Sequence, residues 1–182
     1  MIGRPAILGY AGIVILAIAV LGIAVALAPL LPATQPAVAA PQSLSVTYQY
    51  SAEAAYEEIR VNESMLVHTF FAERTQDCDA WVKQSPCWKE QDLTTVSYPL
   101  TPAQVSRLRS VVQSTGFMSL DPVSGGVNDG QRSYPYTISV NDNGTEKTVV
   151  YQSFPGASPE PAAFVAVRDA LVSLNEDVSG LR

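Results

Sequence analysis

Few side chains in this sequence are suited to covalent or acid–base chemistry. The chain has two cysteines, Cys78 and Cys87, and a single histidine, His68. Two cysteines can form a structural disulfide, stay as buried thiols, bridge two molecules or act as a redox pair, although the Cys-x-x-Cys spacing typical of a redox pair is absent. His68 alternates with Leu66 and Phe70, so we expect it to lie on their face of a strand. We predict a structural role for it, because a catalytic role would need a nucleophile or a carboxylate that only the fold could bring to it.

Three segments match ligand-binding motifs only in part. Residues 77–79, Asp-Cys-Asp, offer metal ligands, but no second cluster stands at a recognisable spacing. Residues 142–144, Asp-Asn-Gly, lack the alternate acids and the closing glutamate of a calcium loop, so we interpret them as a hairpin turn. The glycine-rich residues 125–130 precede neither a helix nor Lys-Ser/Thr, and we interpret them as a connection rather than an anion site. We therefore predict no catalytic residue, no metal site and no cofactor, and hence a protein that is not an enzyme.

Surface loops supply the other candidate sites. Asn62-Glu63-Ser64 and Asn143-Gly144-Thr145 are acceptor triplets for N-glycosylation, and both fall at predicted turns. Trp81 and Trp88 accompany the two cysteines, and an aromatic-rich loop of this kind can serve as a binding anchor. The indoles can instead cover a small core, and we favour that interpretation because a domain of this size needs apolar cover.

One N-terminal segment is typical of a transmembrane helix. Residues 6–28, from Ala6 to Ala28, consist almost wholly of Ala, Ile, Leu, Val and Gly, and carry no charge. At about 1.5 Å per residue this helix is about 34 Å long, enough to cross a hydrocarbon core of about 30 Å. Arg4 on its N-terminal side predicts a cytoplasmic tail, residues 1–5, and export of the rest. Cleavage of a signal peptide near Ala39 is the alternative, but the apolar core is longer than the usual length of about 7 to 15 residues.

The exported part is predicted to begin with a stalk and to continue as an acidic domain. Residues 29–42 are rich in proline and alanine and favour an extended chain. All 17 acidic residues belong to the domain, residues 43–182, whereas the whole chain has 11 basic ones, so nucleic acid is excluded as a partner. Because disulfides persist outside the cytoplasm, we predict that Cys78 pairs with Cys87.

Hydrophobic periodicity predicts an α+β domain. Alternation indicates strands near residues 44–50, 57–61, 65–71, 93–98, 136–140 and 147–152. Thr101, Pro102 and Gln104 form a capping-box pattern that begins a helix over Pro102–Ser114. Ser158 is predicted to cap a last helix, whose apolar stripe comprises Phe164, Val167, Leu171, Leu174 and Val178. We expect an antiparallel sheet of about five or six strands, covered on one face by the two helices.

From Leu100 onward, two helical segments enclose a hairpin. The segments are LTPAQVSRLRSVVQSTGF, YTISVNDNGTEKTVVYQ and PAAFVAVRDALVSL, within residues 100–175. In this order of features the chain resembles emfourin-type protease inhibitors and related small exported domains. The resemblance implies a β-rich domain with two helices and an inhibitor that acts through an exposed loop. It assigns no inhibitory residue to a position of this chain.

Together these patterns predict a membrane-anchored, extracytoplasmic domain that is a non-enzymatic interaction or cell-envelope module. Besides the membrane, the expected partner is an unknown extracytoplasmic protein. Two alternatives stay open, namely the protease inhibitor that the resemblance implies and an enzyme whose residues converge only in three dimensions.

Overall fold

The computed structural model describes residues 43–72, 86–126, 130 and 132–180. The predicted tail, transmembrane helix and stalk, residues 1–42, lie outside these ranges, as do Cys78 and Trp81. Within these ranges, no helix has both the length and the apolar character needed to cross a membrane. The chain divides into two units at Ala40, and the second unit holds all of the described residues.

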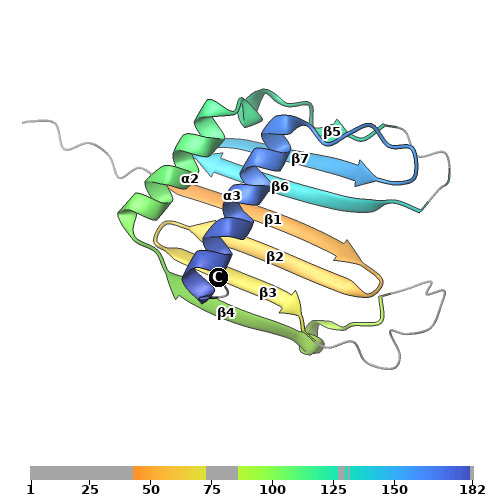
Figure 1. Ribbon diagram of the computed structural model, residues 1–182, viewed down its shortest axis with the longest axis horizontal. Helices are drawn as coiled ribbons and strands as arrows, with labels where there is room; N and C mark the ends of the chain where they lie inside the picture. The colour runs from red at the N-terminus through yellow and green to blue at the C-terminus, as the bar shows by residue number, and fades with distance from the viewer. Residues whose placement is uncertain (1–42, 73–85, 127–129, 131, 181–182) are drawn as a thin grey trace, which may run out of the picture. The chain divides into compact units, whose positions relative to one another are not determined.

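Seven strands form a single sheet. They are β1 (Leu44–Ala52), β2 (Ala55–Asn62), β3 (Met65–Phe71), β4 (Leu93–Pro99), β5 (Val123–Ser124), β6 (Tyr134–Asp142) and β7 (Thr145–Ser153). Their order is β4-β3-β2-β1-β6-β7-β5, and every pair is antiparallel except β5 with β7 (Figure 1). The predicted α+β class is confirmed, but the predicted count of five or six strands is wrong. The added strand, β5, has only two residues and shows no alternation that a sequence pattern could register.

Two tight turns join the strands as the sequence predicts. Glu63 and Ser64 connect β2 to β3, and Asn143 and Gly144 connect β6 to β7. Glu63, Asn143 and Gly144 have φ of 54°, 53° and 84°, the left-handed backbone that two-residue hairpin turns require. The turn residues therefore fix the register in which β2 meets β3 and β6 meets β7.

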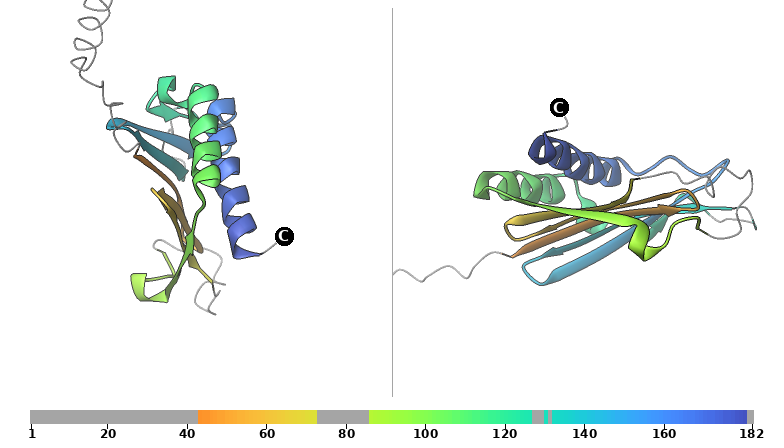
Figure 2. Two further views of the ribbon diagram at one scale, coloured as in Figure 1. Left: turned by 90° about the vertical axis from the view of Figure 1, so that its left-hand side faces the viewer. Right: turned by 90° about the horizontal axis from the view of Figure 1, so that it is seen from below.

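Two longer helices, α2 (Pro102–Ser114) and α3 (Ala162–Ser179), lie on the same face of the sheet (Figures 1 and 2). Short 3₁₀ turns, η3 (Glu90–Asp92) and η4 (Phe117–Ser119), precede β4 and follow α2. The predicted capping box of α2 is confirmed, since Thr101 Oγ1 accepts a hydrogen bond from the Gln104 amide at 3.3 Å. In return, Gln104 Oε1 accepts one from the Thr101 amide at 2.8 Å.

The start of α3 differs from the prediction. Its N-cap is Pro161, without a side-chain cap, whereas Ser158 was expected to cap it. Pro161 disfavours helical geometry at the preceding residue, so the helix begins after it. The backbone of Ser158 is instead used in tertiary contacts, because its amide donates to Gly125 O at 2.9 Å and its carbonyl accepts from the Tyr151 hydroxyl at 2.9 Å.

The core lies between the sheet and the two helices. Alternate residues of the strands, such as Val46, Ile59 and Ile138, are fully buried beneath the helices. The predicted stripe of α3 is confirmed over most of its length, since all of its members except the half-buried Val178 are buried, namely Phe164, Val167, Leu171 and Leu174.

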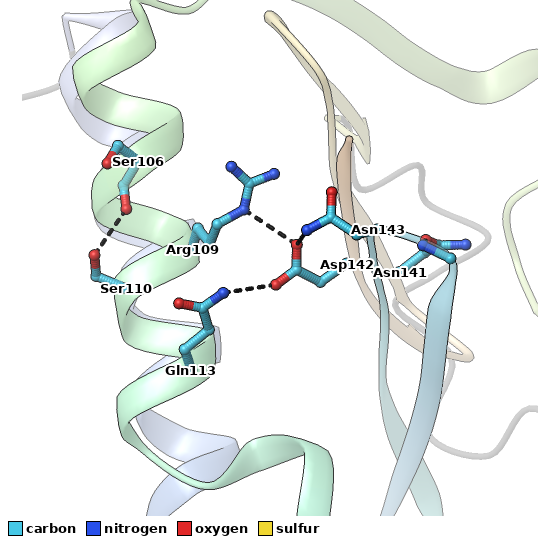
Figure 3. A network of polar contacts seen from close by, with 8 residues as sticks. Ser106, Arg109, Ser110, Gln113, Asn141, Asp142 and Asn143 are labelled. Carbon is cyan, nitrogen blue, oxygen red and sulfur yellow. Dashed lines mark hydrogen bonds and ion pairs between the residues drawn. The ribbon is translucent and has the colours of Figure 1, made fainter. Parts of the chain in front are cut away.

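Asp142, at the end of β6, joins α2 to the sheet by polar contacts (Figure 3). Its Oδ1 accepts from Arg109 Nε at 3.1 Å and its Oδ2 accepts from Gln113 Nε2 at 2.9 Å. The side chains of Arg109 and Asp142 are only 15% and 12% exposed. The carboxylate at this turn thus contacts a helix, and the predicted hairpin turn at residues 142–144 is confirmed.

The helices cover only part of the sheet. They lie over the half of the strands that contains the start of β1 and the turn between β6 and β7 (Figures 1 and 2). At the other end of the strands, around the turn between β1 and β2, neither helix lies over the sheet (Figure 1). The helix-facing side of the sheet therefore has a half that the helices cover and a half that neither helix covers, which we call the uncovered half.

Candidate functional site

The uncovered half carries aromatic rings at neighbouring register positions. Tyr50 on β1 lies opposite Tyr136 on β6 and opposite Glu57 on β2, and Glu57 lies opposite Phe70 on β3. The rings of Tyr50 and Tyr136 stack with centroids 4.5 Å apart and planes at 17°. Since side chains alternate along a strand, Tyr50 shares the face of buried Tyr48, and the row of rings continues the core beyond the helices.

A hollow of about 430 Å³ opens at this end of the sheet. It is lined by Tyr50, Ala54, Ala55, Tyr56, Glu57, His68, Phe70, Phe71 and Ala72. We call this hollow the aromatic hollow. Small alanines at the β1–β2 turn leave room beside large rings on the strands, which is the mixture of apolar wall and few polar groups found in binding sites.

Glu57 is the acidic group of the aromatic hollow. Its side chain is 38% exposed, and its Oε1 lies 3.4 Å from His68 Nε2. That distance suits an ion pair but is too long for a good hydrogen bond, and His68 Nε2 is buried without a hydrogen-bond partner among the described residues. The carboxylate thus lies beside His68 and is still reachable from solvent.

His68 connects the aromatic hollow to α3. Its Nδ1 lies 3.2 Å from Asn175 Nδ2, and its ring stacks on Phe70 with centroids 4.6 Å apart. With the amide of Asn175 donating to Nδ1, a neutral imidazole carries its proton on Nε2, on the side of Glu57. The predicted placement of His68 on the face of Leu66 and Phe70 is confirmed. The fold also places the Glu57 carboxylate beside His68.

The phenols around the hollow are held neutral. Burial raises the pKa of Tyr48, and the negative charge of Glu57 raises that pKa further. Burial likewise raises the pKa of Tyr50, and Tyr136 adds to the effect. Arg168, which is close enough to oppose the shift of Tyr48, is itself bound to Glu160 through Nη1 and Oε1 at 2.6 Å. Glu57 therefore lies beside phenols whose neutral form is favoured.

Two other hollows lack these features. One, of about 370 Å³, lies between α2 and α3 and is lined by residues such as Val111 and Ala170. Another, of about 530 Å³, lies beside the start of β1 and is lined by residues such as Leu100 and Val105. No aromatic side chain lines either of them. Of these three hollows in the described part of the chain, the aromatic hollow is the one that combines rings, a carboxylate and an imidazole.

Cys87 and Trp88 contact the β1–β2 turn and Tyr56. The Cys87 amide donates to Glu53 O at 2.8 Å, and Trp88 Nε1 donates to Ala52 O at 2.9 Å. The Trp88 ring lies against Tyr56, with centroids 4.8 Å apart. Tyr56 alternates with the core-facing residues of β2, so this contact lies on the opposite face of the sheet, and the covering role that we favoured for Trp88 stays a prediction. The disulfide and the loop that holds Trp81 stay predictions, because Cys78 and Trp81 lie outside the described residues.

The other predicted sites are separate from the hollow. Asn62 and Asn143 are both exposed, Asn62 as the last residue of β2 and Asn143 in the β6–β7 turn, and their glycosylation stays a prediction. Residues 77–79 lie outside the described ranges. Within those ranges, no group of three or more His, Cys, Asp and Glu residues is arranged to hold a metal ion.

Sequence reasoning missed the hollow itself. Tyr48, Tyr50, Tyr134 and Tyr136 alternate along two strands, which is a visible signal for an aromatic face. Whether helices cover that face depends on where α3 lies on the sheet, and no local pattern determines this placement.

The chain matches no protein-family model, and no curated protein is similar to it. The resemblance of residues 100–175 to emfourin-type inhibitors stays a prediction.

Proposed function

We propose that this protein is a membrane-tethered, extracytoplasmic binding module that holds a partner protein in the aromatic hollow. The observation that carries the proposal is the stacked pair Tyr50 and Tyr136 beside Glu57, on the half of the sheet that neither helix covers. Tyrosine is enriched in protein interfaces because it buries a large area at a small cost in conformational entropy. Rings held on strands are ordered before binding, which lowers that cost further.

The tethering part of the proposal is supported by the N-terminal sequence. Residues 6–28 are long and apolar enough to span a bilayer, and residues 29–42 suit an extended stalk. The chain enters the domain at the start of β1, at Leu44, whereas Tyr50 lies near the other end of that strand. The point of attachment and the binding surface thus use opposite ends of one strand.

The lining of the hollow favours binding over covalent catalysis. Among the described residues that line it, none is Ser, Thr, Cys or Lys, so this part of the lining offers none of the usual nucleophiles. His68 Nε2 faces the Glu57 carboxylate rather than a nucleophile. Orientation of a binding group is the role that this geometry supports best.

Site-specific photo-crosslinking in the full-length chain tests the proposal. A photoreactive phenylalanine derivative replaces Tyr50 in one variant, and in a control variant it replaces Thr148, which is exposed on the opposite face of the sheet. We expect irradiation of whole cells to give one discrete adduct at position 50 and none at position 148. Mass spectrometry identifies the adduct, and the purified partner should bind the purified chain but not its Tyr136→Ser variant.

The opposite outcomes are equally clear. Equal adducts at positions 50 and 148, or no adduct at position 50, would contradict a partner in the hollow. Turnover of a substrate by the purified chain, abolished by Glu57→Gln, would show that the site is an enzyme instead. A protease panel run on the same preparation tests the inhibitor alternative.

A further inference from the structure

We infer that the aromatic hollow accepts a basic side chain, an arginine or lysine of the partner protein, with Glu57 as counter-ion between the rings of Tyr50 and Phe70. This inference rests on the proposed binding function and names the chemistry that the site recognises. Three observations support it: the aromatic rings on either side of Glu57, the charges near Glu57, and the contacts of His68 with Glu57 and Asn175.

The rings flank the carboxylate on both sides. Glu57 is the direct register partner of Tyr50 on one neighbouring strand and of Phe70 on the other. Directly opposed side chains in an antiparallel sheet have Cβ atoms about 4.5 to 5.5 Å apart, so the carboxylate rises between two aromatic side chains. The face of an aromatic ring attracts a cation, and a carboxylate beside it adds a direct ion pair.

Among the described residues, the ion pairs of Glu57 include no arginine or lysine. The partner that is present, His68, contributes a charge only when it is protonated. Two arginines of the domain pair with other acids, since Arg168 Nη1 binds Glu160 and Arg132 Nη1 lies 3.0 Å from Glu53 Oε1. The chain as a whole has a net charge of −6, which favours encounter with a basic partner.

His68 and Asn175 form a chain of contacts that leads from α3 to the Glu57 carboxylate. Asn175 on α3 contacts His68, His68 faces Glu57, and Phe70 stacks on the imidazole. In the neutral form that accepts from Asn175, the imidazole turns its Nε2–H toward Glu57 without cancelling the charge of the carboxylate. The cation would therefore meet a carboxylate beside a polar group that adds no positive charge.

Other ligand classes fit this site less well. An anion would be repelled by Glu57 at close range. A purely apolar group would exclude water from the carboxylate without giving it a partner, and an unpaired buried charge is strongly unfavourable. A cation with an apolar stem satisfies both the rings and the carboxylate.

Binding of short peptides to the purified full-length chain in detergent tests the inference. The probes are acetyl-Gly-Arg-Gly-amide, its lysine analogue and its citrulline analogue, which keeps the shape of arginine without the charge. Ligand-observed saturation-transfer NMR follows each titration. We expect the arginine or the lysine peptide to bind at least about tenfold more tightly than the citrulline peptide.

Variants distinguish binding at Glu57 from nonspecific attraction of a basic peptide to the acidic protein. Glu57→Gln should weaken binding of the basic peptide about tenfold, whereas Glu146→Gln, an exposed acid on the opposite sheet face, should leave it unchanged. Tyr50→Leu should weaken binding about threefold or more through loss of the ring. Thermal unfolding of each variant shows that it is folded, and affinities are compared only between folded variants.

Each outcome decides one of the two proposals. Equal binding of the arginine, lysine and citrulline peptides, or full affinity in folded Glu57→Gln, would overturn the choice of a basic ligand. A crosslink at position 50 together with such a result would leave the binding module standing and reject its ligand class. Binding of the basic peptide without any crosslink at position 50 would confirm the cation site and reject a protein partner there.

Discussion

The side chain of Asp142 links α2 to the sheet through two hydrogen bonds, to Arg109 and Gln113. Replacement by asparagine removes the charge that Arg109 pairs with, in a setting where both side chains are largely buried. We expect Asp142→Asn to lower the free energy of unfolding by about 1 to 3 kcal/mol. Urea unfolding measures this loss.

A double-mutant cycle with Arg109→Gln isolates the pair, because both residues also make other contacts. A coupling energy near zero would show that the ion pair contributes nothing. Glu146→Gln, on the exposed face of the same hairpin, is the control and should change the unfolding free energy by less than about 0.5 kcal/mol.

Tyr48 makes the stability of the domain sensitive to alkaline pH. Burial and the charge of Glu57 raise its pKa in the folded state, whereas in the unfolded chain it ionises near about pH 10. A raised folded-state pKa means that its contribution is complete below the unfolded pKa and is lost as pH rises above it. We expect the unfolding free energy to fall above about pH 10, and to fall less steeply in Tyr48→Phe. An identical slope in both proteins would contradict this assignment.

The predicted disulfide joins Cys78 to Cys87. The Cys87 amide is held on Glu53 O, so one end of the bridge would be fixed beside the β1–β2 turn. Closing a loop of about 10 residues should stabilise the domain by about 2.7 kcal/mol on the chain-entropy model. Intact-mass measurement after thiol alkylation, with and without reductant, should show two alkylated cysteines only after reduction. A covalent dimer, or alkylation without reductant, would instead reveal one of the alternatives.

Single residues also mark the limit of the sequence analysis. The face of His68 followed from the alternation with Leu66 and Phe70. Its contact with Asn175, which is 107 residues away along the chain, did not follow, because it depends on the packing of α3 across the sheet. Asn175 lies next to the apolar stripe of α3 and is buried, although its residue type suggested a solvent-facing position.

Among the elements, those with local signals were predicted well. The capping box defined α2 to the residue, and the Asn-Gly turn defined the hairpin of β6 and β7. The start of α3 was predicted three residues too early, because Ser158 followed by proline has the form of an N-cap but its backbone bonds to Gly125 and Tyr151. The short β5 was missed because its pairing with β7 depends on a close tertiary approach.

That approach occurs at Gly125, directly after β5. Its φ is +100°, and a Cβ on it would lie 2.2 Å from the Gln152 carbonyl oxygen on β7. We expect Gly125→Ala to lower the unfolding free energy by about 2 to 4 kcal/mol, since it combines backbone strain with a clash that the backbone must move to relieve. Urea unfolding followed by circular dichroism measures the change.

Gly126→Ala provides the matched control. Its φ of +109° imposes a similar strain, but the nearest atom to its Cβ is a ring carbon of Phe154 at 3.8 Å. We expect a loss of about 1 to 2 kcal/mol there. Equal losses in the two variants would mean that the contact with Gln152 is unimportant and that the backbone angle alone matters.

For the whole molecule, the decisive prediction concerns residues 1–42. If Ala6–Ala28 is an uncleaved anchor, full-length protein should stay in the membrane pellet through carbonate washing and begin at its own N-terminal residues. N-terminal sequencing of the pellet and supernatant makes the measurement. Soluble protein that starts near Ala40 would establish cleavage instead.

The position of β1 in the sheet has a mechanical consequence. β1 is the central strand, with three strands on each side, and the chain enters it at Leu44. A pull on the chain at Ser43 acts along the strand, while the hydrogen bonds to β2 and β6 run across it. These bonds are loaded together in shear instead of opening one after another. A partner protein bound at Tyr50 would transmit tension through the same strand. The time for which the partner stays connected to the N-terminal segment under tension would then be set by the rate of forced unfolding of the domain rather than by its equilibrium stability.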